Sequence, residues 1–240
     1  MTAAMRPETR EKLLHVTCAT LTTALFKRGL RNTFLQDVHP VAYKGRNMVG
    51  PAYTLRYIPA REDLNELSVF LDPGHPQRVA IEQCPEGFVL VMDSRKDARA
   101  ASAGDILVAR LMVRGGEGVV TDGGFRDSMG MAELDFPAYH NRPAAPTNLI
   151  RHQAIDINVP IGCGDVPVFP GDIMVGDGEG VVAIPAHIAD DIADEAWEMT
   201  VFEEFVTERV LAGQSIVGLY PPTDGQTVND FQAWRKEKGR

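Results

Sequence analysis

The chain has 240 residues, of which 44% are hydrophobic and 24% charged, a composition typical of a globular protein. This excludes disordered, collagenous and coiled-coil proteins. Lys and Arg number 24, Asp and Glu 33, so the net charge is −9. No central stretch has the composition of a linker. We therefore expect one domain over residues 1–220 and a C-terminal tail over residues 221–240.

Charge, cysteine content and hydropathy indicate the surroundings of the protein. Neutralising phosphates requires clustered Lys and Arg, so this acidic chain is expected to bind neither nucleic acid nor an anionic membrane. Its three cysteines, Cys18, Cys84 and Cys163, are too scattered for a disulfide framework and favour a reducing compartment. The sequence shows no signal peptide and no run near the roughly 20 apolar residues of a membrane span. We expect a cytoplasmic protein.

The first predicted elements are a helix and two strands. Pro7 suits a first helical turn, and leucines at helical spacing follow it, so one continuous helix is expected from Glu8 to Phe26. Residues 48–57 are rich in β-branched and aromatic side chains, which predicts a strand. Residues 87–92 are almost continuously apolar, as expected for a strand buried on both faces.

Strands and helices alternate in the next part of the chain. Residues 105–113 have a helical pattern and residues 118–122 a buried-strand pattern, which together with the preceding strand predicts a βαβ crossover. Further strands are expected near residues 155–159 and at residues 181–185. The predicted class is therefore α/β.

The C-terminal part is predicted to be a long helix and a polar tail. Residues 186–211 are strongly helical, with a stop at Gly213. The tail carries one aromatic pair, Phe231 and Trp234. Two interpretations stay open: the tail wraps a neighbouring subunit, or it frays.

The stretch from Gly104 to Asp127 carries the residues most suited to chemistry. Residues 104–107 open a helix after a glycine, so free backbone N–H groups there can receive a carboxylate. The predicted strand at residues 118–122 ends in Gly123 and Gly124, a sharp turn expected to let the backbone approach a ligand. Arg126 and Asp127 are expected at the carboxyl end of that strand, where ligands bind in open α/β sheets. Arg126 offers a planar pair of donors to a carboxylate or enolate oxygen. Asp105 and Asp127 supply hard oxygen ligands suited to Mg²⁺ or Mn²⁺. The alternative is an ordinary surface Arg–Asp pair without function.

This stretch resembles a known family of enzymes. Asp105, twenty residues and then Arg126 and Asp127 match the Asp-X20-Arg-Asp pattern of the class II pyruvate aldolases, typified by 4-hydroxy-4-methyl-2-oxoglutarate/4-carboxy-4-hydroxy-2-oxoadipate aldolase, in the RraA-like superfamily. Residues 49–54 resemble the early Gly-x-Ala-x-Thr strand of the family, and residues 170–185 resemble its late hairpin. The resemblance covers roughly Leu13 to Tyr220.

The resemblance implies a fold and a set of site residues. The fold would be a layered α-β-β-α, swivelling β/β/α-type single domain, assembled as trimers or hexamers with sites between subunits. Asp127 would ligate the Mg²⁺ or Mn²⁺ cofactor, Asp105 would hold its water shell, and Arg126 would contact the keto oxygen. The pyruvyl carboxylate would be received by the amides of Gly104, Asp105, Ile106 and Leu107. A neighbouring subunit would contribute a glutamate, for which the candidates are Glu203 and Glu204.

The resemblance also implies a reaction. It is the metal-dependent retro-aldol cleavage of a 4-hydroxy-2-oxo acid to pyruvate and a second carbonyl product, with oxaloacetate decarboxylation as a companion activity. The alternative is a non-catalytic regulator of ribonuclease E activity, acting by protein–protein binding. Asp127 favours the enzyme, since the residue after the arginine is typically not Asp in the regulators, which removes the metal ligand. The six histidines lack metal-ligand spacing, Cys163 is expected to pack, and residues 93–97 are expected to form a solvated loop.

Overall fold

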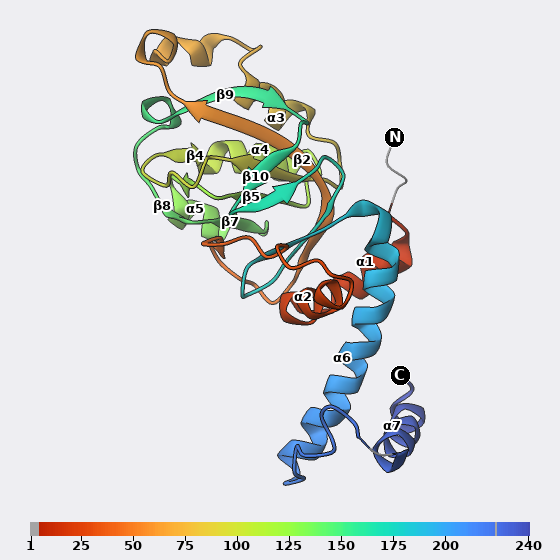
Figure 1. Cartoon of the computed structure of the whole chain (residues 1–240). Coiled ribbons are helices and arrows are strands. Elements are labelled where there is room, and N and C mark those ends of the chain that lie inside the picture. Colours follow the sequence, from red (N-terminus) through yellow and green to blue (C-terminus); the bar gives the residue numbers. More distant parts are fainter. Residues whose placement is uncertain (1–4, 224) are drawn as a thin grey trace.

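The computed structural model describes residues 5–223 and 225–240 (Figure 1). The α-helices are α1 Pro7–Leu13, α2 Cys18–Lys27, α3 Pro76–Gln83, α4 Asp105–Val113, α5 Ser128–Glu133, α6 Ala189–Leu211 and α7 Gly225–Lys238. The 3-10 helices are η1 Glu62–Leu64, η2 Leu67–Leu71, η3 Asn148–Ile150 and η4 Ala186–Ile188. The strands are β1 His39–Pro40, β2 Met48–Pro59, β3 Val89–Asp93, β4 Ala101–Ala103, β5 Gly118–Thr121, β6 Gly124–Phe125, β7 Ala138–His140, β8 Arg142–Pro143, β9 His152–Ile157, β10 Ile161–Cys163, β11 Val166–Val168, β12 Ile173–Gly176 and β13 Val181–Ile184.

The predicted opening helix is in fact two helices, α1 and α2. The prediction of one helix was wrong because Thr17 adopts an extended conformation and caps a new helix, its hydroxyl accepting a hydrogen bond from the Thr20 amide at 3.2 Å. Leu13 and Leu21, on opposite sides of the break, are both fully buried in one apolar cluster. The spacing of the apolar residues therefore predicted correctly that these side chains are buried, but it did not predict the break between the two helices.

The predicted βαβ crossover is confirmed. β3 and β5 pair in parallel, with α4 between them in the chain. They belong to an eight-stranded sheet of order β1-β7-β5-β3-β2-β12-β13, in which β9 also pairs with β2. The long strand β2 organises this sheet, since it runs parallel to β3 and pairs antiparallel with both β12 and β9. The strand expected near residues 155–159 is β9, which begins three residues earlier and ends at Ile157, and the predicted late hairpin is β12–β13.

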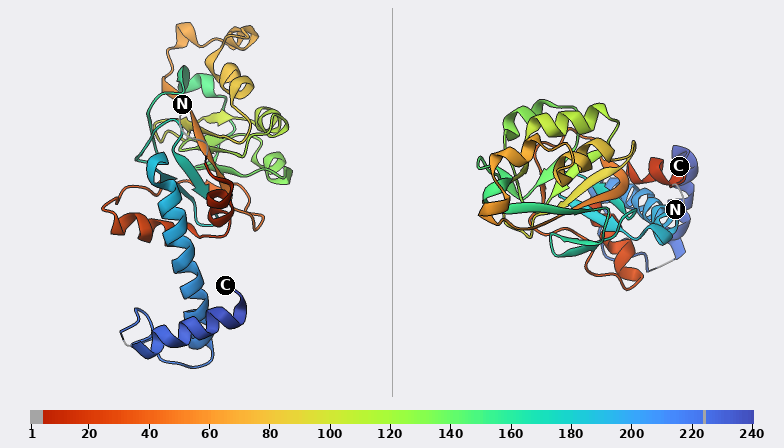
Figure 2. Two further views of the ribbon diagram at one scale, coloured as in Figure 1. Left: turned by 90° about the vertical axis from the view of Figure 1, so that its right-hand side faces the viewer. Right: turned by 90° about the horizontal axis from the view of Figure 1, so that it is seen from above.

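Three buried clusters give the domain its layers. One cluster packs α3 and α4 against β2, β3 and β5. A second lies between strands, joining β3 and β5 to β10–β11 and β12–β13, and it contains the fully buried Cys163. A third packs α1, α2 and the first half of α6 against β12 and β13. The β3–β5 part and the β12–β13 part of the one eight-stranded sheet thus face each other across the second cluster, and helices cover the outer side of each part. These layers form the α-β-β-α arrangement that the resemblance implied (Figures 1 and 2).

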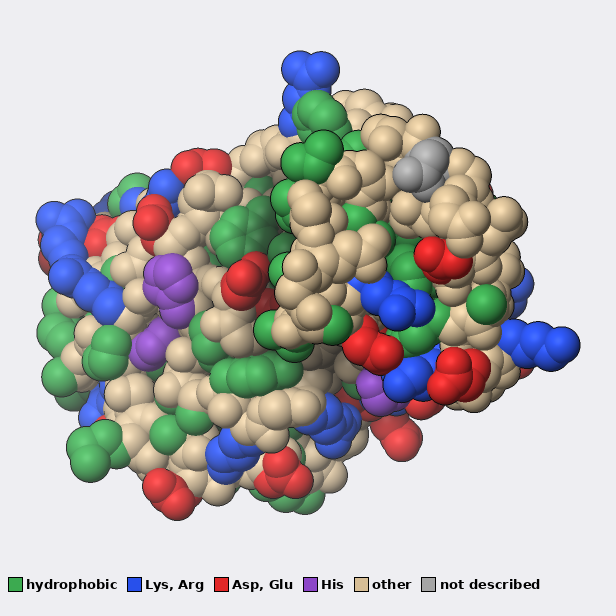
Figure 3. Space-filling model, turned by 90° about the horizontal axis from the view of Figure 1, so that it is seen from below, with side chains coloured by type: hydrophobic (Ala, Val, Ile, Leu, Met, Phe, Trp, Pro, Cys, Tyr) green, Lys and Arg blue, Asp and Glu red, His purple; other side chains and the backbone are tan. Residues whose placement is uncertain are grey.

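Helix α6 leaves this body and carries α7 at its far end (Figures 1 and 2). Phe231 and Trp234 of α7 are buried against Val201 and Phe205 of α6. The prediction of fraying was therefore wrong, because the tail forms a helix that packs on α6 of its own chain. Its contact with a neighbouring subunit stays a prediction. Figure 3 views the molecule from this side and shows acidic, basic and hydrophobic side chains interspersed.

None of the described helices combines the length and the apolar character needed to cross a bilayer.

Candidate functional site

A second, three-stranded parallel sheet gathers the predicted site residues. Its order is β4-β6-β8, and each strand leads at its carboxyl end into one wall of a single cavity of about 320 Å³. Ligands bind outside the carboxyl ends of strands in open α/β sheets. The cavity is lined by the following residues: Phe70, Gln77, Arg78, Ala101, Ala103, Gly104, Asp105, Ile106, Leu107, Arg126, Asp127, Thr147 and Asn148.

The segment after β6 places Arg126 and Asp127. The sequence suggested that they end the strand at residues 118–122, but the short strand β6 intervenes and carries them into the second sheet. The Arg126 amide donates to the Ala103 carbonyl at 3.1 Å, which ties this segment to β4. Arg126 Nε lies 3.1 Å from Asp127 Oδ2, and the two side chains are 47% and 48% exposed, so both remain open to a ligand.

Asp127 has a left-handed backbone conformation, with φ 57° and ψ 32°, at the start of α5. Its carbonyl accepts a hydrogen bond from the Met131 amide at 3.0 Å. Aspartate tolerates this region better than most residues. The conformation turns the chain from β6 into α5 and holds the carboxylate beside Arg126.

The segment after β4 forms the amino end of α4. Gly104 precedes the helix, and the structure confirms the helix start that the sequence predicted. The amide of Ile106 donates to Asp105 Oδ1 at 2.7 Å, while the amides of Asp105 and Leu107 have no acceptor among the described residues. Free amides at the positive end of a nine-residue helix suit a carboxylate ligand.

Gly104 is required here by the close approach of the segment after β6. A Cβ atom at this position would lie 3.0 Å from Arg126 Cγ and 3.1 Å from Asp127 Oδ2. The missing side chain therefore lets the arginine and the carboxylate lie directly against the helix start.

The donor set can accommodate a divalent cation. Asp105 and Asp127 line the same cavity, and carboxylate oxygens suit Mg²⁺ or Mn²⁺. Among residues 5–223 and 225–240, no three His, Cys, Asp or Glu side chains are grouped as a metal centre. Mg²⁺ commonly binds through one or two carboxylates and keeps several waters, and this pair matches that pattern.

Four further polar residues line the cavity and were not predicted from the sequence. Gln77 and Arg78 come from α3, and Thr147 and Asn148 from the segment after β8. None belongs to a recognisable motif. Thr147 and Asn148 could have been found as polar residues that follow a strand. That strand, β8, has only two residues and no strand-like pattern, so the sequence did not predict it.

Gly123 and Gly124 serve packing rather than ligand approach. A Cβ at Gly123 would lie 2.6 Å from Ser94 Cβ, and one at Gly124 would lie 2.5 Å from Ala144 Cβ. Neither glycine lines the cavity. The adjacent Asp122 is buried, which raises its pKa to about 6, and it accepts a hydrogen bond from the Ser94 amide at 2.7 Å. The expectation that this double glycine approaches a ligand was wrong.

Glu203 and Glu204 do not line the cavity of their own chain. Glu203 accepts hydrogen bonds from Thr20 Oγ1 and from the Tyr220 hydroxyl, each at 3.0 Å. Glu204 accepts one from Arg240 at 2.9 Å. Their role in a neighbouring subunit's site stays a prediction.

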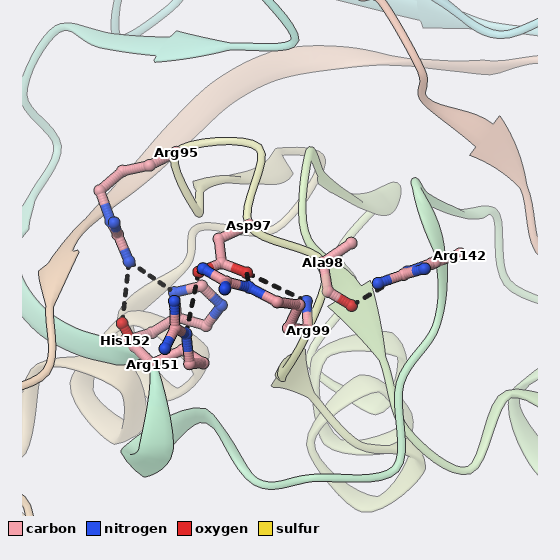
Figure 4. A network of polar contacts seen from close by, with 7 residues as sticks. All are labelled: Arg95, Asp97, Ala98, Arg99, Arg142, Arg151 and His152. Atoms are coloured by element: carbon pink, nitrogen blue, oxygen red, sulfur yellow. Dashed lines mark hydrogen bonds and ion pairs between the residues drawn. The ribbon is translucent and has the colours of Figure 1, made fainter.

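The loop after β3 forms a separate arginine network, shown in Figure 4. Burial would raise the pKa of Asp97, but hydrogen bonds from Arg99 outweigh it, so the pKa lies below its ordinary value. Arg151 also donates to Asp97 at 3.0 Å, and Arg95 lies 3.2 Å from His152 Nδ1. The loop is thus fixed against the start of β9, outside the cavity that holds Arg126.

Comparisons with known proteins agree with this architecture. A family model for RraA-like proteins, described as Aldolase/RraA, matches residues 18–183. A protein of Halalkalibacterium halodurans named "Putative 4-hydroxy-4-methyl-2-oxoglutarate aldolase" is 35% identical over 118 residues, which are 49% of this chain and 55% of that protein. Protein DlpA of Legionella pneumophila is 22% identical over 210 residues, which are 88% of this chain and 33% of DlpA. The chain thus spans only 33% to 55% of the length of these two relatives.

Solved structures share the fold. An uncharacterized protein from Pseudomonas syringae pv. tomato superimposes with a TM-score of 0.76 at 23% identity, covering 89% of this chain and 97% of that one. Streptomyces coelicolor RraAS2 is described as an unusual member of the RNase ES inhibitor RraA protein family. It superimposes with a TM-score of 0.72 at 28% identity, covering 84% of this chain and 96% of that one. Because the family model matches more than half of its length, the chain belongs to the RraA-like family.

Proposed function

We propose that the protein is a divalent-metal-dependent lyase that cleaves a 4-hydroxy-2-oxo acid to pyruvate and a second carbonyl compound, with oxaloacetate decarboxylation as a companion activity. One observation carries the proposal: Asp105, Arg126, Asp127 and the free amides of α4 all line one cavity. The aldolase name of the Halalkalibacterium halodurans relative supports the same reaction class.

Each group has a task that its chemistry allows. The amides at the start of α4 receive the carboxylate next to the keto group. Arg126 donates to the keto oxygen, where negative charge develops as the bond breaks. Asp127 and Asp105 would hold Mg²⁺ or Mn²⁺, which when bound supplies Lewis-acid polarisation of that oxygen.

The proposed cleavage balances without a further reactant. The C4 hydroxyl loses its proton, the C3–C4 bond breaks, and C4 leaves as a carbonyl. The electron pair stays on the three-carbon fragment as the pyruvate enolate, which becomes pyruvate when C3 takes a proton. Oxaloacetate gives the same enolate when its C4 leaves as CO₂. Arg126 stabilises this common anion, so both activities should depend on it.

The proposal is tested by following pyruvate. The protein is incubated with Mg²⁺ or Mn²⁺ and either oxaloacetate or a 4-hydroxy-2-oxo acid, with and without a chelator. The rate of pyruvate formation with the metal but without the protein is subtracted. Asp127→Asn should lower activity at least 100-fold, since it removes the charge of the carboxylate. Asp135→Asn, an exposed aspartate outside the cavity, should leave activity unchanged. Full activity in Asp127→Asn would refute the site.

The alternative function is non-catalytic regulation through protein binding, as in the RNase E activity regulators. The similarity to Streptomyces coelicolor RraAS2 supports it. Silence of the wild-type protein toward oxaloacetate and a panel of 4-hydroxy-2-oxo acids would favour this alternative.

A further inference from the structure

A second cavity, of about 440 Å³, lies at the opposite end of the β4-β6-β8 sheet from the cavity that holds Arg126. It is lined by residues 95–99, Asn141 and Arg142, which lie before β4 and at the start of β8. These residues also follow β3 and β7, which run parallel in the main sheet with β5 between them. Ligands bind outside the carboxyl ends of such strands. Among residues 5–223 and 225–240, none lines both cavities.

Figure 4 shows four arginines and one carboxylate, Asp97, in a network of polar contacts at this cavity. Arg99 donates to both carboxylate oxygens, at 2.8 and 2.7 Å, and Arg151 donates to one of them at 3.0 Å. Arg95 and Arg142 form no ion pair with any described residue, and each donates to a backbone carbonyl, at 2.8 and 3.3 Å. The network therefore carries three more positive than negative charges, in a chain whose net charge is −9.

The acidic side chains near this network have partners of their own. Asp165 and Asp37 pair with the Lys96 ammonium, at 2.7 and 3.3 Å. Asp93 interacts electrostatically with Arg95 and accepts a hydrogen bond from the Arg95 amide at 2.9 Å. None of these three carboxylates lines the cavity, so its wall stays positive.

The loop that carries the first of these arginines is held in a costly backbone conformation. Arg95 and Lys96 are both left-handed, with φ 58° and 57°, a region that residues with long side chains seldom occupy. The buried Asp122 fixes this loop, because its carboxylate accepts from the Ser94 amide at 2.7 Å and from the Lys96 amide at 3.0 Å. Strain of this kind is concentrated at ligand sites, where it holds the binding groups in position.

We propose that this cavity binds the diphosphate group of a small molecule, free or esterified, through Arg95, Arg99 and Arg142. The planar donors of arginine match phosphate oxygens in pairs. One phosphate carries about 1.5–2 negative charges at pH 7, so it would leave part of the excess positive charge unpaired, whereas a diphosphate balances it. No aromatic side chain of the described residues lines the cavity, so recognition depends on the phosphoryl groups and not on a stacked base. The proposal is independent of the lyase activity.

The test is calorimetry on the full chain in buffer without divalent metal, with pyrophosphate, ADP and inorganic phosphate as ligands. Pyrophosphate should bind at least tenfold more tightly than inorganic phosphate. Arg95→Gln and Arg142→Gln should each weaken pyrophosphate binding at least tenfold, and both side chains are exposed, so the fold should tolerate the changes. Arg31→Gln is the matched control and should leave the affinity unchanged, because Arg31 is also exposed and lacks an ion pair but lies over Phe26, away from the cavity.

The remaining outcomes identify the ligand or reject the site. ADP binding as tightly as pyrophosphate would identify an esterified diphosphate, and ADP that fails to bind would identify free pyrophosphate. Arg126→Gln should leave pyrophosphate binding unchanged. Loss of binding in Arg126→Gln but not in Arg142→Gln would place the anion in the other cavity and overturn the proposal. A wild-type protein that does not bind pyrophosphate, or that binds inorganic phosphate equally well, would also overturn it.

Discussion

Substituting Gly104 by alanine tests whether the contact between the start of α4 and the Arg126–Asp127 pair controls activity. The added Cβ would lie 3.0 Å from Arg126 Cγ, 3.1 Å from Asp127 Oδ2 and 3.3 Å from Arg126 Cδ. Ordinary van der Waals contacts begin near 3.4 Å, so the two side chains must each move by several tenths of an ångström. Both carry the charges that the proposed reaction requires.

The magnitude follows from this displacement. A misplacement of 1 Å at a reacting group costs about 100-fold in rate, so a displacement of about 0.3–0.4 Å predicts a loss of about fivefold. Stability should change little. Gly104 has φ −116° and ψ 174°, which alanine adopts without strain, and replacing a glycine cap by alanine costs about 0.5 kcal/mol.

The assay is pyruvate formation in Gly104→Ala, with unfolding by urea measured on the same sample. Gly162→Ala is the matched control, because its added Cβ would meet no atom within 4 Å. The control should keep full activity. A Gly104→Ala protein that is also fully active would refute the placement of Arg126 and Asp127 at the reaction centre. A loss of activity with a large loss of stability would show a folding defect instead.

Three other predictions concern stability. Thr17→Ala should lower the free energy of unfolding by about 1 kcal/mol, measured in urea, because α2 loses its hydroxyl cap. Trp234→Ala should release α7, seen as fast hydrogen exchange over Gly225–Lys238, since large-to-small changes of buried aromatics cost about 3–5 kcal/mol. Burial lowers the pKa of His140 to about 4, below the unfolded value of about 6.5. The neutral ring therefore contributes at most about 3 kcal/mol to the free energy of unfolding above pH 6.5, and this contribution is lost as the pH falls toward 4. In His140→Phe, the free energy of unfolding measured in urea across this pH range should no longer show that loss.

The sequence predicted those parts of the fold in which one local pattern determines the structure. The apolar runs of β3 and β5 and the glycine-bounded helix α4 gave the crossover, because a buried parallel strand has an unmistakable composition. The sheet β4-β6-β8 was missed, since its strands have two or three residues and pair only through tertiary contacts. That sheet, rather than β5, positions the cavity.

The same distinction explains which site residues were found. Asp105, Arg126 and Asp127 follow each other at a fixed spacing, so a motif could reveal them. Arg78 and Asn148 are 70 residues apart in the chain and meet only because α3 and the segment after β8 line one cavity. An arginine in the first turn of a helix and an asparagine in a short 3-10 helix have ordinary structural explanations, so no sequence pattern marks either of them as a cavity residue.

The backbone at residue 127 determines which substitution can test the metal site. Asp127 has φ 57°, and most side chains pay about 1–2 kcal/mol in this region. Alanine would therefore remove the carboxylate and strain the turn into α5 together, so a dead Asp127→Ala enzyme would have two explanations. Asparagine tolerates the same conformation and keeps the shape, and only the charge is lost. If Asp127→Asn folds like the wild type but forms no pyruvate, the charge itself is required. If it stays active while alanine fails, Asp127 matters for the turn and the cation is held elsewhere.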